Sequence, residues 1–275
     1  MKKKQLRQQA LQGQIAMVTG GAQGLGLAIA EHLAREGAIV AIADVQAKQA
    51  KRSAQLLQVQ GLKVKAVPLN IAVSHEVDVC FAKFVKEFGR LDILVNNAGV
   101  GQTIAPVVEL TDEEWQRVIN ITLTGTFYCC RTAARIMERQ EAGCIVNLAS
   151  INGQNPAALA AAYNVAKAGV ISLSKTLALE LAAYGVRVNA ISPGPVYTEF
   201  NKTVMAQRCS RLNITEAEMI ERIRKSIPLG RWGQAGEIAA AVVFLCSPAA
   251  SWITGEVLRV SGGLEGVSAA PPKRN

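Results

Sequence analysis

Short apolar segments alternate with longer segments of helical pattern through most of the 275-residue chain. The apolar runs are continuous rather than alternating, which is typical of strands in a sheet that helices cover on both faces. Because a helical pattern follows most of these runs, the chain reads as a series of βαβ units with a parallel sheet. We predict strands at 15–19, 39–44, 64–69, 93–96, 144–149, 186–191 and 257–260.

The segments between these strands have the composition and periodicity of helices. Thr111 is followed three residues later by Glu114, which predicts a capping box at the start of one long helix. The first predicted helix follows the first strand and ends at about residue 36. Further helices are predicted over 46–60, 74–88 and 234–245, and two more begin at Thr111 and at Pro156.

No internal repeat or linker divides the chain. The predicted fold class is therefore α/β, with a single doubly wound Rossmann-like domain, a seven-stranded parallel sheet and helices on both faces. We expect a flexible basic tail at 1–12, a dinucleotide-binding catalytic domain at 13–266 with a lid-like segment at about 199–231, and a flexible tail at 267–275.

Composition narrows the class of protein. Hydrophobic residues make up 50% of the chain and charged residues 19%, as in a soluble protein with a large core. The sequence contains no apolar run long enough to span a membrane, and the N-terminal segment is polar rather than signal-like, so we expect no membrane partner. Six cysteines without C-x-x-C spacing favour reduced thiols in the cytoplasm, and two isolated histidines favour no metal site.

The net charge of +9 raises the possibility of an acidic partner. Six of the 30 basic residues lie in the first seven and the last three positions, however, and no basic stripe contains interleaved aromatic residues. We therefore expect no nucleic-acid partner.

A glycine-rich segment, Thr19–Gly26, joins the first predicted strand to the first helix. Glycines at such a junction let the backbone approach a pyrophosphate, which binds at the positive end of the helix. The spacing is G-x-x-x-G-x-G and differs from the common G-x-G-x-x-G fingerprint, so a tight turn without a ligand is the alternative. Its position directly after the first strand of a βαβ series favours dinucleotide binding.

Two further strand ends carry polar residues. Asp44 ends the second strand, where a carboxylate accepts hydrogen bonds from the adenosine ribose and repels a 2′-phosphate. No Lys or Arg follows it directly, which predicts NAD in preference to NADP, although Asp44 is also placed to cap the next helix. The segment Asn96–Gly99 ends the fourth strand, where open sheets bind ligands and where ordinary turns also occur.

Tyr163 and Lys167 stand four residues apart in a predicted helix and so share one face. A phenol has a pKa of ~10, and a neighbouring ammonium group lowers it, which suits acid–base chemistry on an alcohol or ketone. Ser150 lies thirteen residues upstream of Tyr163, at the end of an apolar run. Taken alone, the Tyr-Lys pair could equally be a solvated surface pair.

Together these motifs resemble those of the short-chain dehydrogenase/reductase family over nearly the whole chain. T-G-G-A-Q-G-L-G resembles its cofactor loop, N-N-A-G its strand-stabilising motif, Y-N-V-A-K its Y-x-x-x-K motif, and R-V-N-A-I-S-P-G-P-V-Y-T its R-x-N-x-x-x-P-G-x-x-x-T segment. Asn120 falls where we expect the family's helix asparagine. The pattern is similar to that of polyol and sugar-alcohol dehydrogenases, and to that of 3-oxoacyl-carrier-protein reductases.

The resemblance implies roles for four catalytic residues. Tyr163 would exchange a proton with the substrate oxygen, and Lys167 would lower the pKa of Tyr163 and hold the nicotinamide ribose. Ser150 would orient the substrate oxygen, and Asn120 would hold a water that links Lys167 to solvent. Asn152, in the loop after Ser150, would be a further substrate contact.

The resemblance also implies a set of cofactor contacts from several segments. Asn70 stands where the family has an Asp that pairs with the adenine amino group, and its amide oxygen can still accept a hydrogen bond. The implied contacts are Gly20, Gln23, Gly24, Leu25, Gly26, Asp44, Asn70, Ile71, Asn97, Ala98, Gly99, Tyr163, Lys167, Pro193, Gly194, Val196 and Thr198.

The predicted function is an NAD-dependent oxidoreductase that transfers a hydride between nicotinamide and a secondary alcohol or ketone, of polyol or sugar type. One alternative is a 3-oxoacyl-carrier-protein or acyl-CoA reductase, whose acidic carrier could bind Arg131, Arg135 and Arg139. Another is a non-catalytic nucleotide-binding regulatory protein. The basic lid could attract a phosphate or carboxylate, but a solvated helix face is the favoured interpretation. By resemblance, we expect a homotetramer.

Overall fold

The computed structural model describes residues 9–266, so most of the predicted basic tail and all of the predicted tail at 267–275 lie outside the described residues. All seven predicted strands are present and parallel, in the order β3-β2-β1-β4-β5-β6-β7. This confirms the predicted doubly wound sheet. The strands are β1 (Ile15–Thr19), β2 (Ile39–Asp44), β3 (Val64–Pro68), β4 (Ile93–Asn96), β5 (Gly143–Leu148), β6 (Val186–Pro193) and β7 (Val257–Val260).

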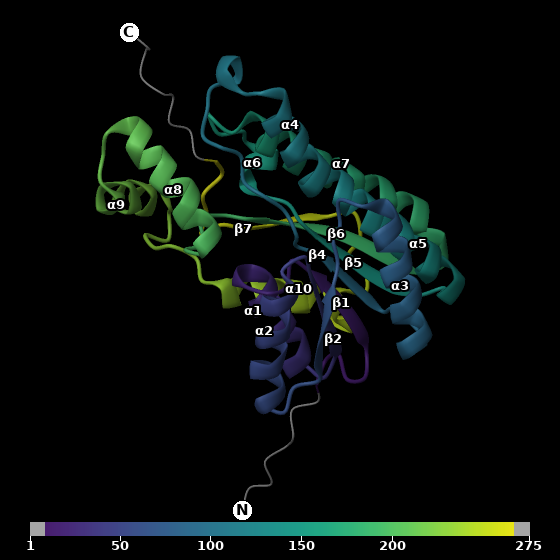
Figure 1. The fold of residues 1–275 in the computed structure, drawn as a ribbon. Coiled ribbons are helices and arrows are strands. Elements are labelled where there is room, and N and C mark those ends of the chain that lie inside the picture. Colours follow the sequence, from purple (N-terminus) through teal and green to yellow (C-terminus); the bar gives the residue numbers. More distant parts are fainter. Residues whose placement is uncertain (1–8, 267–275) are drawn as a thin grey trace, which may run out of the picture.

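Helices cover both faces of the sheet, as the continuous apolar strands predicted (Figure 1). Helices α1, α2 and α10 pack on one face, and α3, α5 and α7 pack on the other. The longer helices are α1 (Gly24–Arg35), α2 (Ala47–Val59), α3 (Ser74–Phe88), α4 (Asp112–Ile119), α5 (Gly125–Gln140), α7 (Ala161–Leu181), α8 (Glu199–Leu212), α9 (Glu216–Ser226) and α10 (Ala235–Cys246).

Each face of the sheet has its own apolar core. On the first face, Ile29 and Leu33 of α1 and Val242 of α10 pack against the strands. On the second face, Phe81 of α3 and Met137 of α5 are fully buried. Burying such side chains contributes about 1.5–3 kcal/mol each, so the two cores fix the sheet and with it the edge at which the strands end.

Three local predictions were wrong. The helix expected from Pro156 begins at Ala161, and the loop after Ser150 contains a short helix, α6 (Ile151–Gln154). Thr111 does accept a hydrogen bond from the Glu114 amide, but the Glu114 carboxylate binds Arg117 and the Thr103 amide, so the capping box is incomplete.

The N-terminal boundary also differs from the prediction. Leu11, which was placed in the flexible tail at 1–12, is fully buried, and its amide donates to the carbonyl oxygen of Glu36. Its apolar side chain anchors this stretch beneath α1, so the ordered domain begins before residue 13.

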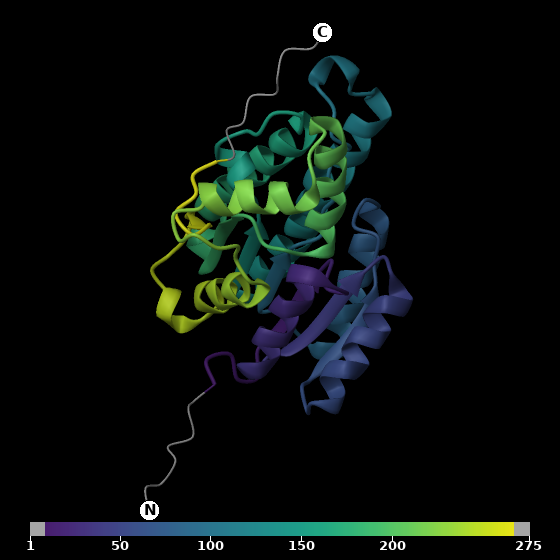
Figure 2. The ribbon, with the colours of Figure 1, turned by 90° about the vertical axis from the view of Figure 1, so that its left-hand side faces the viewer.

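The segment predicted to form a lid makes a helix pair, α8 and α9, that stands apart from the sheet (Figures 1 and 2). Thr198 and Thr215 cap the two helices, and Thr215 and Glu218 form a capping box. Met205 and Cys209 of α8 pack with Met219 of α9 in a small core of their own. Within residues 9–266, no helix is both long enough and apolar enough to cross a membrane.

Candidate active site

The glycine-rich loop leaves the first turn of α1 open toward a cavity. Gln23, the N-cap residue, makes no side-chain cap hydrogen bond, and the first turn contains no acidic residue. Gly24 has a φ of +57°, and a Cβ atom added there would meet nothing within 4 Å. The amide groups and the positive end of the helix dipole are therefore available to an anion such as a pyrophosphate.

Other glycines in this loop are required by close packing. A Cβ atom on Gly26 would lie 2.2 Å from the Gly20 carbonyl oxygen and 2.5 Å from Nδ2 of Asn97. That Nδ2 atom donates to the carbonyl oxygens of Thr19 and Gly20. Thr19 Oγ1 in turn accepts from the amides of Asn97 and Ala98. The N-N-A-G motif thus fixes the glycine loop to the end of β4.

Asp44 is buried at the end of β2, and its carboxylate lies at the cavity wall. One oxygen accepts from the Ala22 amide at 3.0 Å, and the other accepts from the Gln46 amide at 2.9 Å. Because each carboxylate oxygen has a second lone pair, both remain able to accept a ribose hydroxyl. Asn70 lies nearby in the same wall, where its side-chain oxygen accepts from the Ala72 amide at 3.1 Å.

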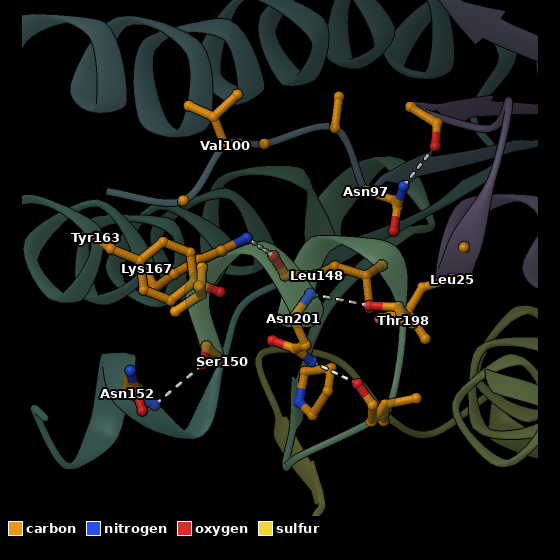
Figure 3. A pocket seen from close by; sticks show the side chains of 18 of the residues that line it. Leu25, Asn97, Val100, Leu148, Ser150, Asn152, Tyr163, Lys167, Thr198 and Asn201 are labelled. Atoms are coloured by element: carbon orange, nitrogen blue, oxygen red, sulfur yellow. Dashed lines mark hydrogen bonds between the residues drawn. The ribbon is translucent and has the colours of Figure 1, made fainter. Parts of the chain in front are cut away.

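Ser150, Tyr163 and Lys167 lie close together in the wall of the cavity (Figure 3). Ser150 Oγ accepts from the Asn152 amide at 3.1 Å and also forms a hydrogen bond with Tyr163. Nζ of Lys167 is 2.6 Å from the carbonyl oxygen of Leu148 and 5.8 Å from the centre of the Tyr163 ring. The serine from the end of β5 and one face of α7 therefore form a single polar cluster.

Burial governs the titration of this cluster. It raises the pKa of Tyr163, and the hydrogen bond with Ser150 opposes that rise. Burial also lowers the pKa of Lys167 to about 8, because the ammonium loses water and gains a single carbonyl partner. That Lys167 lowers the pKa of Tyr163 stays a prediction.

The structure does not bring Asn120 to the cavity, which corrects its predicted role. Asn120 is exposed at the start of a π-helical turn (Asn120–Thr124) between α4 and α5. Positions two apart on a helix point in nearly opposite directions, and here Thr122 is the buried one. Thr122 Oγ1 accepts from the Val100 amide at 3.1 Å and lies within donating distance, 3.3 Å, of its carbonyl oxygen.

Thr122 also lies close to Lys167. A Cβ atom on Gly99 would be 3.4 Å from Thr122 and 3.7 Å from Nζ of Lys167. Thr122 therefore holds the loop after β4 close to Lys167 of α7. No motif in the sequence distinguishes it from Asn120, because the π-helical turn is not visible there.

Gln102 is a second residue that the motifs did not indicate. It is buried, and its side-chain oxygen accepts from the amides of Ala162 and Tyr163 at 2.7 and 3.4 Å. Its Nε2 atom donates to the carbonyl oxygen of Leu159, a residue with a φ of +68°. The N-cap residue of α7, Ala160, offers no side chain for this purpose, so Gln102 caps the helix that carries Tyr163.

The segment after β6 closes the cavity beside this cluster. A Cβ atom on Gly194 would lie 2.7 Å from Cα of Ser261, so only glycine fits where β6 meets the chain after β7. The side-chain Nδ2 atom of Asn201 donates to the Val196 carbonyl oxygen, and the backbone amide of Asn201 donates to Oγ1 of Thr198 (Figure 3). Asn201, another residue that the motifs missed, thus fixes the turn into α8.

The cavity has a volume of about 620 Å³, and all of the predicted site residues except Gly26 and Asn120 line it. Gly26 serves the packing of the loop, and Asn120 faces outward. The outer end of the cavity lies beneath the α8–α9 lid and is largely apolar. Its lining includes Ile104, Ile151, Val204, Met205, Ile223 and Trp232.

A parallel sheet with a glycine-rich first turn, an acidic residue at the end of the second strand and a Ser-Tyr-Lys cluster beside the strand ends is typical of dinucleotide-binding oxidoreductases. Comparison with known proteins supports the assignment to this class of enzyme. The family model described as enoyl-(acyl carrier protein) reductase matches residues 20–265. The chain belongs to the short-chain dehydrogenase/reductase family.

Its relatives include enzymes of both predicted substrate types. A sorbitol dehydrogenase from Cereibacter sphaeroides is 36% identical over 92% of this chain and 98% of its own. A 3-oxoacyl-[acyl-carrier-protein] reductase from Synechocystis is 37% identical over 93% of this chain and 98% of its own. The crystal structure of NAD+-bound xylitol dehydrogenase is 31% identical and superposes with a TM-score of 0.87, over 92% of this chain and 99% of its own.

Proposed function

We propose that the protein is an NAD-dependent oxidoreductase that interconverts a secondary alcohol and a ketone on a small polyol- or sugar-type molecule. The observation that carries this proposal is the meeting of Ser150, Tyr163 and Lys167 in the cavity into which the open first turn of α1 faces. An acid–base cluster beside a dinucleotide site is the arrangement that hydride transfer to or from an alcohol carbon requires.

In the oxidation direction, Tyr163 takes the hydroxyl proton of the substrate while Ser150 holds the same oxygen. A bound nicotinamide would supply the hydride acceptor and, in its oxidised form, a positive charge that favours the phenolate of Tyr163. Lys167, whose Nζ lies 5.8 Å from the centre of the Tyr163 ring, adds a positive charge of its own, because its pKa of about 8 keeps it mostly protonated at neutral pH. Because burial raises the pKa of Tyr163, alcohol oxidation should quicken as the pH rises, and ketone reduction should slow.

The residues present fit a dinucleotide. The pyrophosphate would bind at Gly20, Gln23 and Gly24, where the first turn of α1 has free amides. The adenosine would bind beside Asp44, Asn70, Ile71 and Asn97–Gly99, and the nicotinamide beside Pro193, Gly194, Val196 and Thr198. Each of these residues lines the cavity.

The preference for NAD rests on Asp44. Its carboxylate would accept the two ribose hydroxyls and repel a 2′-phosphate. The basic residues in the cavity wall are Lys167 and Arg208, and neither is on β2 or the glycine loop. Asp44→Ala should therefore lower the ratio of kcat/KM with NAD to that with NADP about ten- to hundredfold. An unchanged ratio would remove this argument; Asp92→Ala, at a buried acidic residue outside the cavity wall, controls for the loss of a carboxylate.

A reductase of 3-oxoacyl-carrier-protein or acyl-CoA substrates is the second candidate. It would need a basic docking surface, for which α5 offered Arg131, Arg135 and Arg139. Arg131, however, donates to Ser74 Oγ and packs over the rings of Phe127 and Tyr128, which supports a structural role for it. Assays of polyols, other secondary alcohols and 3-oxoacyl thioesters, each with NAD and NADP, decide between the two candidates.

A non-catalytic nucleotide-binding protein is less well supported, because nothing in such a role requires Ser150, Tyr163 and Lys167 together. Exposed apolar side chains on α5 and α7, including Phe127, Val165 and Leu179, support association into the expected homotetramer, which sedimentation can test. The six free, buried cysteines support a reducing compartment such as the cytoplasm.

A further inference from the structure

The lid segment has seven basic side chains, and the structure separates one of them from the rest. Five form ion pairs, and Arg222 is exposed to water. The ion pairs are Lys202 with Glu199, Arg211 with Glu109, Arg224 and Lys225 with Glu221, and Arg231 with Glu237. These charges are already balanced or solvated, so they need no ligand.

Arg208 is different. It lines the cavity from α8, and no carboxylate within residues 9–266 forms an ion pair with it. Its Nε atom is buried without a hydrogen-bond partner, and the terminal nitrogen reaches the Ala158 carbonyl oxygen only at 3.5 Å. Arg208 as a whole is half-buried, and this partial burial lowers its pKa because the guanidinium has lost some of its water without gaining an anion. A charge in this position is costly unless a bound anion satisfies it.

The position of Arg208 places that anion at the substrate end. Ala158 lies in the loop that leads into the Tyr163 helix, and Gln207, the residue before Arg208, accepts from the Ile104 amide. Both contacts are with segments that surround Tyr163, whereas the pyrophosphate would bind at the glycine-rich loop. The same end is otherwise lined mostly by apolar side chains, including Ile104 and Met205.

We propose that the substrate is a hydroxy acid or its keto acid, in which a carboxylate binds Arg208 while the alcohol or ketone carbon lies at Tyr163. This inference rests on the proposed function and narrows its substrate class. A guanidinium binds a carboxylate through two parallel hydrogen bonds, which would satisfy the unpaired Nε. One cation in an apolar surrounding balances a monoanion better than it balances a phosphate dianion. The carboxylate is held unchanged; the alcohol carbon gives up the hydride and Tyr163 takes the proton.

The test compares secondary alcohols of equal chain length that end in a carboxylate, a methyl ester or a phosphate. The native protein should favour the carboxylate over the ester about ten- to hundredfold in kcat/KM, the range expected of a charge-assisted pair. Arg208→Met should abolish this preference and leave activity on the ester within about threefold of the native value. Arg208→Lys should keep part of the preference, and Arg222→Met, at the exposed lid arginine, should keep all of it.

Three outcomes would overturn the inference: no preference for the carboxylate, a preference that Arg208→Met leaves intact, or a stronger preference for the phosphate. A loss of NAD affinity in Arg208→Met, measured by fluorescence titration, would also overturn it, since Arg208 would then serve the cofactor. If one of these outcomes is found but the protein still turns over neutral alcohols, the inference about Arg208 fails and the proposed function is still supported. If the native protein binds NAD but turns over none of the alcohols or ketones, the proposed function itself fails.

Discussion

The two ends of the cavity are built in different ways. The cofactor end consists mainly of backbone and short side chains where β1, β2 and β4 end, and parallel strands bring those ends to one edge. The outer end is assembled by side chains from distant segments. Arg211 and Gln207 of α8 both bind the backbone of Ile104, across 107 and 103 positions of the chain.

Because of this difference, the groups that would bind the cofactor and the groups that would bind the substrate come from different parts of the chain. A pyrophosphate and a ribose are recognised by amides, glycines and one carboxylate, which the order of strands and turns positions directly. In the proposed function, a substrate would contact the side chains that line the outer end, and the positions of these side chains depend on how α8 and α9 pack. The same sheet edge can therefore keep one cofactor while the lid determines the substrate.

The largest expected effect lies at the boundary between the two ends. Tyr163→Phe removes the proton donor and acceptor while it keeps the ring, so kcat should fall by about a thousandfold or more. The affinity for NAD should stay within about twofold, because the glycine loop and Asp44 are untouched. Steady-state kinetics and cofactor titration measure the two effects, and Tyr184→Phe, at an exposed tyrosine after α7, should change neither. Near-normal turnover in Tyr163→Phe would contradict the acid–base role of Tyr163.

The cofactor end and the sheet could be predicted from the sequence because their signals are local. The strand at Ile15–Thr19, the strand at Ile39–Asp44 and the helix at Ser74–Phe88 have the predicted bounds. In each case a continuous apolar run or a helical pattern ends at a turn residue or a cap. The glycine loop was visible for the same reason, since its spacing and its place after the first strand are both properties of a short segment.

The rest of the site depends on packing that a short segment does not encode. Asn120 was predicted and Thr122 was missed, because the sequence does not show the π-helical turn that starts at Asn120 and buries Thr122. Gln102 and Arg208 lie outside the motifs, and their partners, Ala162 and Ala158, lie 60 and 50 positions away. The sequence also does not distinguish among the seven basic side chains of the lid, whereas the structure shows that five of them form ion pairs and that Arg208 and Arg222 do not, within the described part of the chain.

Lys167 lies between the two ends of the cavity, and burial changes its protonation. Its pKa falls from 10.5 to about 8 on burial, so between these pH values the folded chain has released a proton that the unfolded chain still binds. Raising the pH through this window therefore stabilises the folded protein, by up to about 3 kcal/mol at the upper limit. Lys167→Met has no such proton, so its free energy of unfolding should lack this rise.

The measurement is denaturant unfolding of both proteins from pH 7 to 10, taken as the difference between them. Burial raises the pKa of Cys80 to about 11 and that of Cys130 to about 12, which destabilises both proteins above about pH 9 and cancels in the difference. Lys175→Met, at an exposed lysine of the same helix, should follow the native curve. Parallel curves for the native protein and Lys167→Met would contradict the depressed pKa.

The smallest expected effect, at Gln102, tests whether the cofactor end and the outer end of the cavity act independently. Gln102→Leu removes the acceptor for the Ala162 and Tyr163 amides, so kcat should fall about tenfold and the free energy of unfolding should fall by about 1–3 kcal/mol. Gln102→Glu keeps the acceptor and should recover part of kcat. NAD affinity should not change in either variant.

If Gln102→Leu lowers stability alone, with kcat and its pH profile unchanged, Gln102 supports the fold but does not position Tyr163. If NAD affinity falls together with kcat, the loop at Gln102 reaches the cofactor end through the neighbouring Val100 and Thr122 contact. The two ends would then be coupled through the backbone that follows β4. A fall in kcat alone, partly restored by Gln102→Glu, would show that the capping of α7 sets the position of Tyr163 without help from the cofactor end.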